Sequence, residues 1–178
     1  MSEATPIEVP EGVPWKIVLG IDPGTRVMGY GALVLRPEGP VLLAAGTLRA
    51  PAGESPPRRL GILLDRLEDL LGRLKPDVVV VESAFAGENV QSAIRIGEGR
   101  GLALAVAARR GLEVMEVTPA SAKRAVTGNG RADKEQVAQM VARELGLEAP
   151  PDSRDATDAL AMALTYVLRK SVPGQARP

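Results

Sequence analysis

Four acidic residues stand where a carboxylate could do chemistry. Asp22 directly follows the strand-like stretch 16–21, and Glu82 directly follows four consecutive valines at 78–81. A buried strand that ends on an acid brings an ionised group close to apolar surroundings, which costs free energy unless a partner is present. The cheapest partner for several converging carboxylates is a divalent metal ion.

The other two acids, Asp155 and Asp158, lie three residues apart at the start of a predicted helix over about 153–170. This spacing places both on one helix face. A helix start also favours acids electrostatically, so the alternative is that Asp152 or Asp155 simply caps the helix. Taken together, the four acids predict a two-Mg²⁺ site, in which the metal charge balances the carboxylates and supports hydrolysis of a phosphodiester.

The composition narrows the chemistry further. The chain has no cysteine and no histidine, which excludes disulfides, the usual zinc sites and a histidine base. Oxygen ligands select Mg²⁺ or Mn²⁺ over Zn²⁺. The net charge of the chain is zero, yet positions 95 to 143 contain nine basic residues and only five acidic ones. This local surplus favours a phosphate-facing side, although a solvated charged face is the alternative.

The strands that carry these acids are predicted from hydrophobic patterns. At 178 residues the chain fits one α/β domain with a full core. The valine run has no polar alternation, which is typical of a strand covered on both faces. Acids at the ends of such strands lie at the sheet edge where α/β proteins bind ligands. The expected strands are 16–21, about 28–35, 41–48, 78–81 and 112–117.

Helices are predicted between and after the strands. Leucines recur at helical spacing over 58–74. A second helix over 90–110 contains Gly97, Gly99 and Gly101, and each glycine costs on the order of 1 kcal/mol, so we expect either a close backbone approach or a break there. Thr118 and Asp133 have the residue types of helix N-caps. The remaining helices are expected over about 118–126, 133–145 and 153–170.

The two ends of the chain differ from the rest. Residues 1–14 are acidic and proline-containing, and residues 171–178 lack a hydrophobic pattern, so both are expected to be disordered around a single domain at 15–170. The first residues have neither a basic start nor an apolar core. We therefore expect a cytoplasmic protein.

Five motifs follow one another along the chain: GIDPGTRVMGYG at 20–31, VESAF at 81–85, QSAIRIGEGRG at 91–101, TPASAKRAVTG at 118–128 and DATDALA at 155–161. In this order and spacing they resemble the RuvC-type Holliday-junction resolvases, which belong to the RNase H-like superfamily. The resemblance covers about residues 16–170.

This resemblance implies an RNase H-like fold, with a mixed five-stranded sheet of three antiparallel strands followed by parallel strands, flanked by helices. It also implies a homodimer that makes paired nicks in a four-way DNA junction with two Mg²⁺ per active site, or with Mn²⁺, and that works with a branch-migration helicase complex of the RuvA and RuvB type. Carried over by position, Asp22, Glu82, Asp155 and Asp158 match the metal-binding acids.

The resemblance also implies DNA contacts. Phe85 matches an aromatic residue that stacks on a base near the crossover, and stacking of this kind contributes roughly 1–3 kcal/mol per base. Lys123 and Lys134 match basic residues at the DNA, with Lys134 near the scissile phosphate. Without the resemblance, a hydrophobic loop anchor and two surface lysines would be the simpler interpretations. Further candidates for phosphate contact are Arg95, Arg100, Arg124 and Arg131.

Three alternatives stay open at this point. The GIDPGT motif at 20–25 also resembles a phosphate loop of actin-like and sugar-kinase ATPases, but no second phosphate motif follows. A junction-binding scaffold without cleavage would not need four acids. An RNase H-fold nuclease could act on another branched or hybrid substrate. For the dimer, we expect the glycine-containing helix at 90–110 to form part of the interface, since a two-fold axis suits two equivalent cuts.

Overall fold

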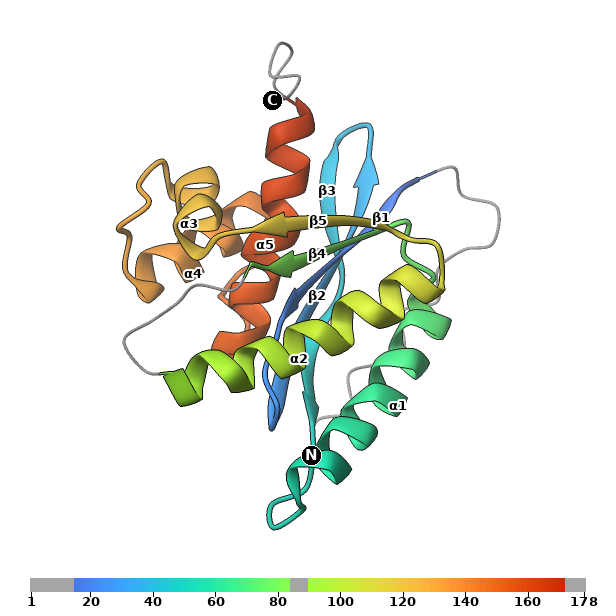
Figure 1. Ribbon diagram of the computed structural model, residues 1–178. Coiled ribbons are helices and arrows are strands. Elements are labelled where there is room, and N and C mark those ends of the chain that lie inside the picture. The colour runs from blue at the N-terminus through green and yellow to red at the C-terminus, as the bar shows by residue number, and fades with distance from the viewer. Residues whose placement is uncertain (1–14, 84–89, 172–178) are drawn as a thin grey trace.

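The computed structural model describes residues 15–83 and 90–171, and Figure 1 shows how their helices and strands are arranged. The expected N-terminal lead at 1–14, the loop that carries Phe85 and residues 172–178 lie outside the described residues. Within the described part, one twisted sheet lies between two layers of helices (Figure 1).

The sheet has five strands in the order β3-β2-β1-β4-β5. The first three strands pair antiparallel, and β4 and β5 then run parallel to β1. The mixed sheet predicted from the sequence is therefore confirmed. The strands are β1 (Ile17–Asp22), β2 (Val27–Arg36), β3 (Gly39–Arg49), β4 (Val78–Glu82) and β5 (Glu113–Val117).

Two helices cover one face of the sheet and three cover the other (Figure 1). The first layer consists of α1 (Pro56–Leu74) and α2 (Val90–Arg109), and the second of α3 (Pro119–Thr127), α4 (Lys134–Glu144) and α5 (Arg154–Ser171). The leucine stripe of α1 packs into the hydrophobic core between this first layer and the sheet, as its helical spacing predicts. The central helix of the second layer is α5, whose apolar stretch contacts β1 and β2.

Strand alternation decides which way the first two acids point. In β1, Leu19 and Ile21 belong to the core under α1 and α2, whereas Val18 belongs to the core under α5. Because successive side chains alternate between faces, Asp22 lies on the face of Val18, toward α5. The same alternation in β4 directs Glu82 toward α5. Both strands therefore present their terminal acid to the same helix.

The predicted helix starts are confirmed for α3 and α4. The Thr118 hydroxyl accepts from the Ser121 N–H at 3.1 Å, and Asp133 accepts from the Gln136 N–H at 2.8 Å in a capping box. Helix α2 runs from Val90 to Arg109 as one helix, so a break at its glycines is wrong. Among the helices of the described ranges, none combines the length and apolarity needed to cross a membrane.

Candidate active site

The four acids meet at one edge of the sheet. Asp22 is the last residue of β1 and Glu82 the last residue of β4, and these parallel strands end side by side. Asp155 lies in the first turn of α5, and Asp158 follows one turn later. All three other acids act electrostatically on Asp22. The four acids therefore lie close enough to influence one another electrostatically.

Close contact between α5 and the sheet brings the helical acids to the strand ends. A Cβ added at Gly20 would lie 1.9 Å from the Ala159 carbonyl oxygen, and one added at Gly29 would lie 2.1 Å from the Asp155 carbonyl oxygen. Gly29 is also the cross-strand neighbour of Asp22. Any side chain at these two positions would push α5 away, so both glycines are needed to build the site. Sequence reasoning missed them, although glycine inside a strand signals close backbone approach.

The start of α5 is capped by a residue other than the acids. Ser153 directly precedes the helix, and its Oγ accepts from the Ala156 N–H at 3.4 Å. The alternative in which Asp152 or Asp155 serves as the cap is therefore wrong. Asp155 lies in the first turn of α5, where the partial positive charge of a helix N-terminus favours a carboxylate.

Burial and mutual repulsion disfavour ionisation at the strand ends. Burial is the largest cause that raises the pKa of Asp22 to about 7, followed by the negative charges of Glu82, Asp158 and Asp155. Burial and Asp158 also raise the pKa of Glu82. Strongly shifted carboxylates that interact with one another are typical of functional sites. A bound cation would therefore stabilise this cluster of carboxylates.

Lys134 is a cation that the fold itself supplies to the cluster. It is the first residue of α4, and its Nζ lies 3.2 Å from Asp158 Oδ2. Its positive charge lowers the pKa of both Asp22 and Glu82, in opposition to the larger causes that raise them. One exposed lysine cannot balance four carboxylates. The predicted site residue Lys134 thus lies beside the acids, and most of the negative charge of the four carboxylates stays uncompensated.

The donor set fits hard divalent ions. It consists of carboxylate oxygens alone, which suit Mg²⁺ and Mn²⁺. Across residues 15–83 and 90–171, no three acids stand close enough together to hold an ion as they are. Repulsion between like charges opposes closer approach, and bound cations would remove that repulsion. Bound cations would therefore allow the four acids to approach one another more closely.

The predicted DNA-contact residues lie on three segments. Lys123 and Arg124 lie on α3, Arg131 lies in the turn before α4, and Arg95 is exposed on α2. Arg100 differs from this expectation because its guanidinium forms an ion pair with Glu116 of β5. The two residues are 16 positions apart on different elements and carry no pairing signal, so the sequence could not reveal this contact. Phe85 lies outside the described residues.

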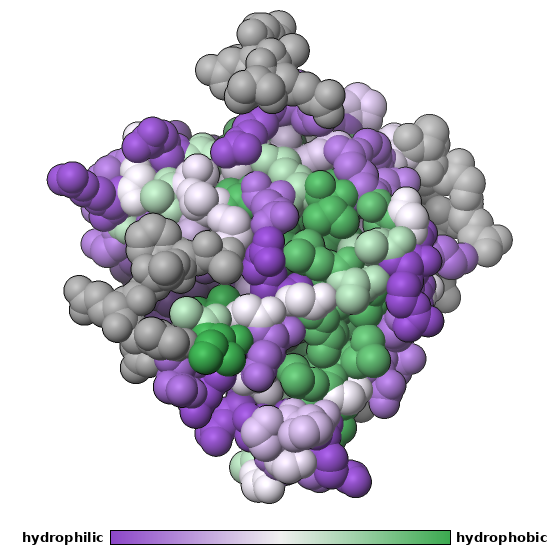
Figure 2. Space-filling model, in the orientation of Figure 1, coloured by the Kyte–Doolittle hydropathy of each residue, from purple (hydrophilic) through white to green (hydrophobic). Residues whose placement is uncertain are grey.

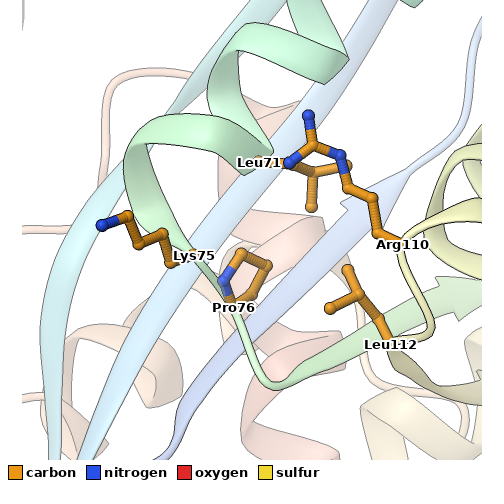
Figure 3. Close-up of a pocket in the computed structure, with 5 residues that line it drawn as sticks. All are labelled: Leu71, Lys75, Pro76, Arg110 and Leu112. Atoms are coloured by element: carbon orange, nitrogen blue, oxygen red, sulfur yellow. The ribbon is translucent and has the colours of Figure 1, made fainter.

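A pocket of about 310 Å³ lies elsewhere, at the opposite edge of the sheet. Figure 3 shows its lining side chains, which come from the end of α1 and from the segments before β4 and β5. Asp22 and Glu82 stand at the ends of β1 and β4, whereas the pocket lies before the starts of β4 and β5. The pocket therefore lies at the wrong end of the strands to take part in chemistry at the acid cluster. Its lining residues are Leu71, Lys75, Pro76, Arg110 and Leu112.

Comparisons with known proteins agree with this geometry. Residues 18–166 match the family model described as "Crossover junction endodeoxyribonuclease RuvC". A protein of that name from Moorella thermoacetica is 44% identical over 150 residues, which is 84% of this chain and 90% of the relative. The solved structure of Thermus thermophilus RuvC is 33% identical, with a TM-score of 0.78, over 86% of this chain and 95% of that one.

A second Thermus thermophilus structure shows RuvC in complex with a Holliday junction substrate. It is 33% identical to this chain, with a TM-score of 0.80, and the match covers 87% of this chain and 94% of that one. The family match spans β1 and α5, which carry the first and last acids of the cluster. The chain therefore belongs to the RuvC family of crossover junction endodeoxyribonucleases.

Proposed function

We propose that this protein is an endonuclease that resolves four-way DNA junctions by paired, symmetric nicks during recombination and repair. The observation that carries the proposal is the cluster of Asp22, Glu82, Asp155 and Asp158 at one sheet edge, in a chain of the RuvC family. Four clustered acids argue against a scaffold that only binds junctions. The family match likewise argues against the ATPase alternative.

The four carboxylates would hold two divalent ions, Mg²⁺ or Mn²⁺. Such a pair activates water on one side of the scissile phosphate and stabilises the leaving oxygen on the other, which would yield a 5′-phosphate and a 3′-hydroxyl. Asp22 and Glu82 provide rigid ligands because each ends a buried strand. Lys134 holds Asp158 at 3.2 Å and places a positive charge at the site, where it would contact the scissile phosphate.

DNA would approach over the surface next to the acids. Lys123 and Arg124 lie on α3 and Arg131 in the turn before α4, which begins at Lys134, and basic side chains of this kind would suit a phosphate backbone. Arg95 and Phe85 keep their proposed roles in phosphate contact and base stacking. For Arg100 we propose a weaker role in DNA contact, since Glu116 neutralises most of its charge.

A homodimer would place two such sites on the two equivalent strands of a junction. Helix α2 is our candidate for the interface. Figure 2 shows hydrophobic side chains gathered on the face that carries α1 and α2. Ile94 of α2 is 50% exposed, more than any other large hydrophobic residue whose burial is described. Sedimentation at micromolar concentration checks this, and a monomer would contradict it.

We also propose a branch-migration helicase complex of the RuvA and RuvB type as a partner, because junctions must move to reach a cutting position. Junction resolution on chromosomal DNA supports a cytoplasmic location. Capture of the assembled helicase complex on junction DNA, with and without this protein, checks the partnership.

The decisive experiment is cleavage of a synthetic mobile four-way junction with Mg²⁺, Mn²⁺ or EDTA, beside linear duplex and RNA–DNA hybrid controls. We expect paired nicks at symmetric positions on the junction alone, with ligatable ends, and none in EDTA. Tight junction binding without nicks would favour the scaffold alternative. Cleavage of the hybrid alone would keep the nuclease chemistry and reject the substrate.

A further inference from the structure

Helix α2 touches the turn that follows the first acid of the cluster. Gly99 is buried, and a Cβ added there would lie 2.8, 2.9 and 3.0 Å from the oxygen, carbon and nitrogen of Gly24. Backbone atoms cannot yield to such a contact as a flexible side chain can. Gly24 lies two residues beyond Asp22, between the buried Pro23 and Thr25. The helix therefore rests directly on the turn that leads out of Asp22.

The next residue of α2 fixes the other side of the site. Arg100 forms an ion pair with Glu116, the penultimate residue of β5. Its successor Val117 pairs with Glu82 in the parallel ladder. Gly99 thus contacts the turn after β1, which carries Asp22. Arg100 contacts β5, the strand that pairs with β4 and Glu82. Arg100 is only 23% exposed in its side chain, so solvent weakens this pair less than a fully exposed one.

We propose that Gly99 and Arg100 are positioning residues that set the distance between Asp22 and Glu82. Gly99 lets α2 press on the Asp22 turn, and Arg100 holds the same helix turn to the β4–β5 edge. This inference rests on the proposed metal site, since the position of Asp22 would then control metal affinity. Neither residue touches the reacting atoms, and both act through the acids.

The matched substitution pair is Gly99→Ala and Gly101→Ala. Both replace glycine in the same helix, yet a Cβ at Gly101 meets nothing within 4 Å. Alanine stabilises a helix relative to glycine, so Gly101→Ala should raise the melting temperature by about a few degrees. Gly99→Ala should lose this gain because its Cβ forces α2 and the Gly24 turn apart.

The first readout needs neither metal nor DNA. In EDTA, hydrogen exchange at residues 24–28 should accelerate about fivefold or more in Gly99→Ala and stay unchanged in Gly101→Ala. The second readout is the Mn²⁺ concentration that gives half of the maximal shift in melting temperature without DNA. This concentration should rise about tenfold for Gly99→Ala and stay within about twofold for Gly101→Ala, as loss of a supporting contact around a metal ligand predicts.

Glu116→Gln provides an independent test, because it breaks the ion pair without adding volume and should fold even if Gly99→Ala does not. It should raise the Mn²⁺ midpoint, measured without DNA, about two- to threefold. Wild-type midpoints for both variants would overturn the inference and leave the proposed function intact. Absence of any Mn²⁺ shift in the wild-type protein would overturn the proposed metal site and this inference together.

Discussion

The two ends of the parallel strands differ in whether their charged side chains are paired within the protein. At the edge where β1 and β4 end, Lys134 pairs with one of the four acids, Asp158, and burial and repulsion raise the pKa of Asp22 to about 7. At the edge where β1 and β5 begin, Lys16 Nζ lies 3.2 Å from Glu113 Oε2 and 3.1 Å from the Tyr166 hydroxyl. One edge leaves charge uncompensated for a ligand, whereas the other pairs its charges within the protein.

At the edge where the strands begin, backbone groups also find hydrogen-bond partners. Asp77 Oδ2 accepts from the Ile17 N–H at 2.7 Å, and the Asp77 N–H donates to the Ile17 carbonyl at 2.9 Å. These bonds close the first parallel contact of the sheet. The comparison shows that the fold is stabilised at one end of its strands, so that the other end can carry interactions that oppose stability. Substitutions at the two ends should therefore have different effects on cleavage and on stability.

The largest effect is expected for cleavage by Asp22→Asn or Asp158→Asn. Each removes a proposed metal ligand, so the cleavage rate should fall about a thousandfold or more, equivalent to several kcal/mol of transition-state stabilisation. Junction binding in EDTA should persist because the phosphate contacts are unchanged. Single-turnover cleavage and gel-shift titration measure the two properties, and near wild-type cleavage by either variant would refute the two-metal assignment.

A smaller loss of cleavage is expected for Lys134→Met. This change removes the charge 3.2 Å from Asp158 and should lower the cleavage rate about 10- to 100-fold. Since Lys134 lowers the pKa of Asp22 and Glu82, its loss should also move the pH at which Mn²⁺ half-saturates the protein upward. Lys134→Arg should restore part of both properties. A pH profile identical to wild type would contradict the electrostatic role.

Stability should respond to Asp22 in a pH-dependent way. Its pKa of about 7 in the folded protein exceeds the usual value of 3.8, so the folded state binds the extra proton between these pH values. In EDTA, the free energy of unfolding should therefore fall as pH rises from about 4 to 7. At pH 8, Asp22→Asn should stabilise the protein by about 2–4 kcal/mol.

Urea unfolding in EDTA at pH 4 and pH 8 measures this effect. At pH 4 the wild-type and variant proteins should differ little, because Asp22 is then protonated in the folded protein. Asp65→Asn, at an exposed position of α1, is the control and should leave stability nearly unchanged at both pH values. An equal gain at both pH values would show that the stabilisation does not come from ionisation of Asp22.

The smallest effect is expected at the opposite edge. Glu113→Gln breaks an ion pair whose side chains are both 47% exposed, so it should cost less than about 1 kcal/mol of stability. Cleavage should stay unchanged, since no acid of the cluster is involved. Thermal unfolding and junction cleavage measure both properties. A large loss of cleavage by Glu113→Gln would mean that the two edges are not independent.

Much of this arrangement could be predicted from the sequence, because it depends on local patterns. The valine run predicted β4, and the residue types at Thr118 and Asp133 predicted two helix starts. The placement of the acids followed from strand ends and helix spacing. Their roles, the contacts of Phe85 and the division into lead, domain and tail stay predictions.

Other features depend on contacts between distant segments. Gly20 and Gly29 are needed only because α5 crosses the sheet at these positions, more than a hundred residues later in the chain. The pairing of Arg100 with Glu116 likewise depends on how α2 lies against β5. No local pattern encodes such contacts, so they emerge only once the elements are packed together.

The late position of α5 has a consequence for biosynthesis. Asp22 and Glu82 leave the ribosome early, but Asp155 and Asp158 belong to the last helix of the described chain. The central helix of one core layer is also missing until residues 154–171 have been made. A polypeptide that stalls before this point would hold only half of the acids and lack the support that orients them. The order of synthesis should therefore keep an unfinished chain from cutting DNA.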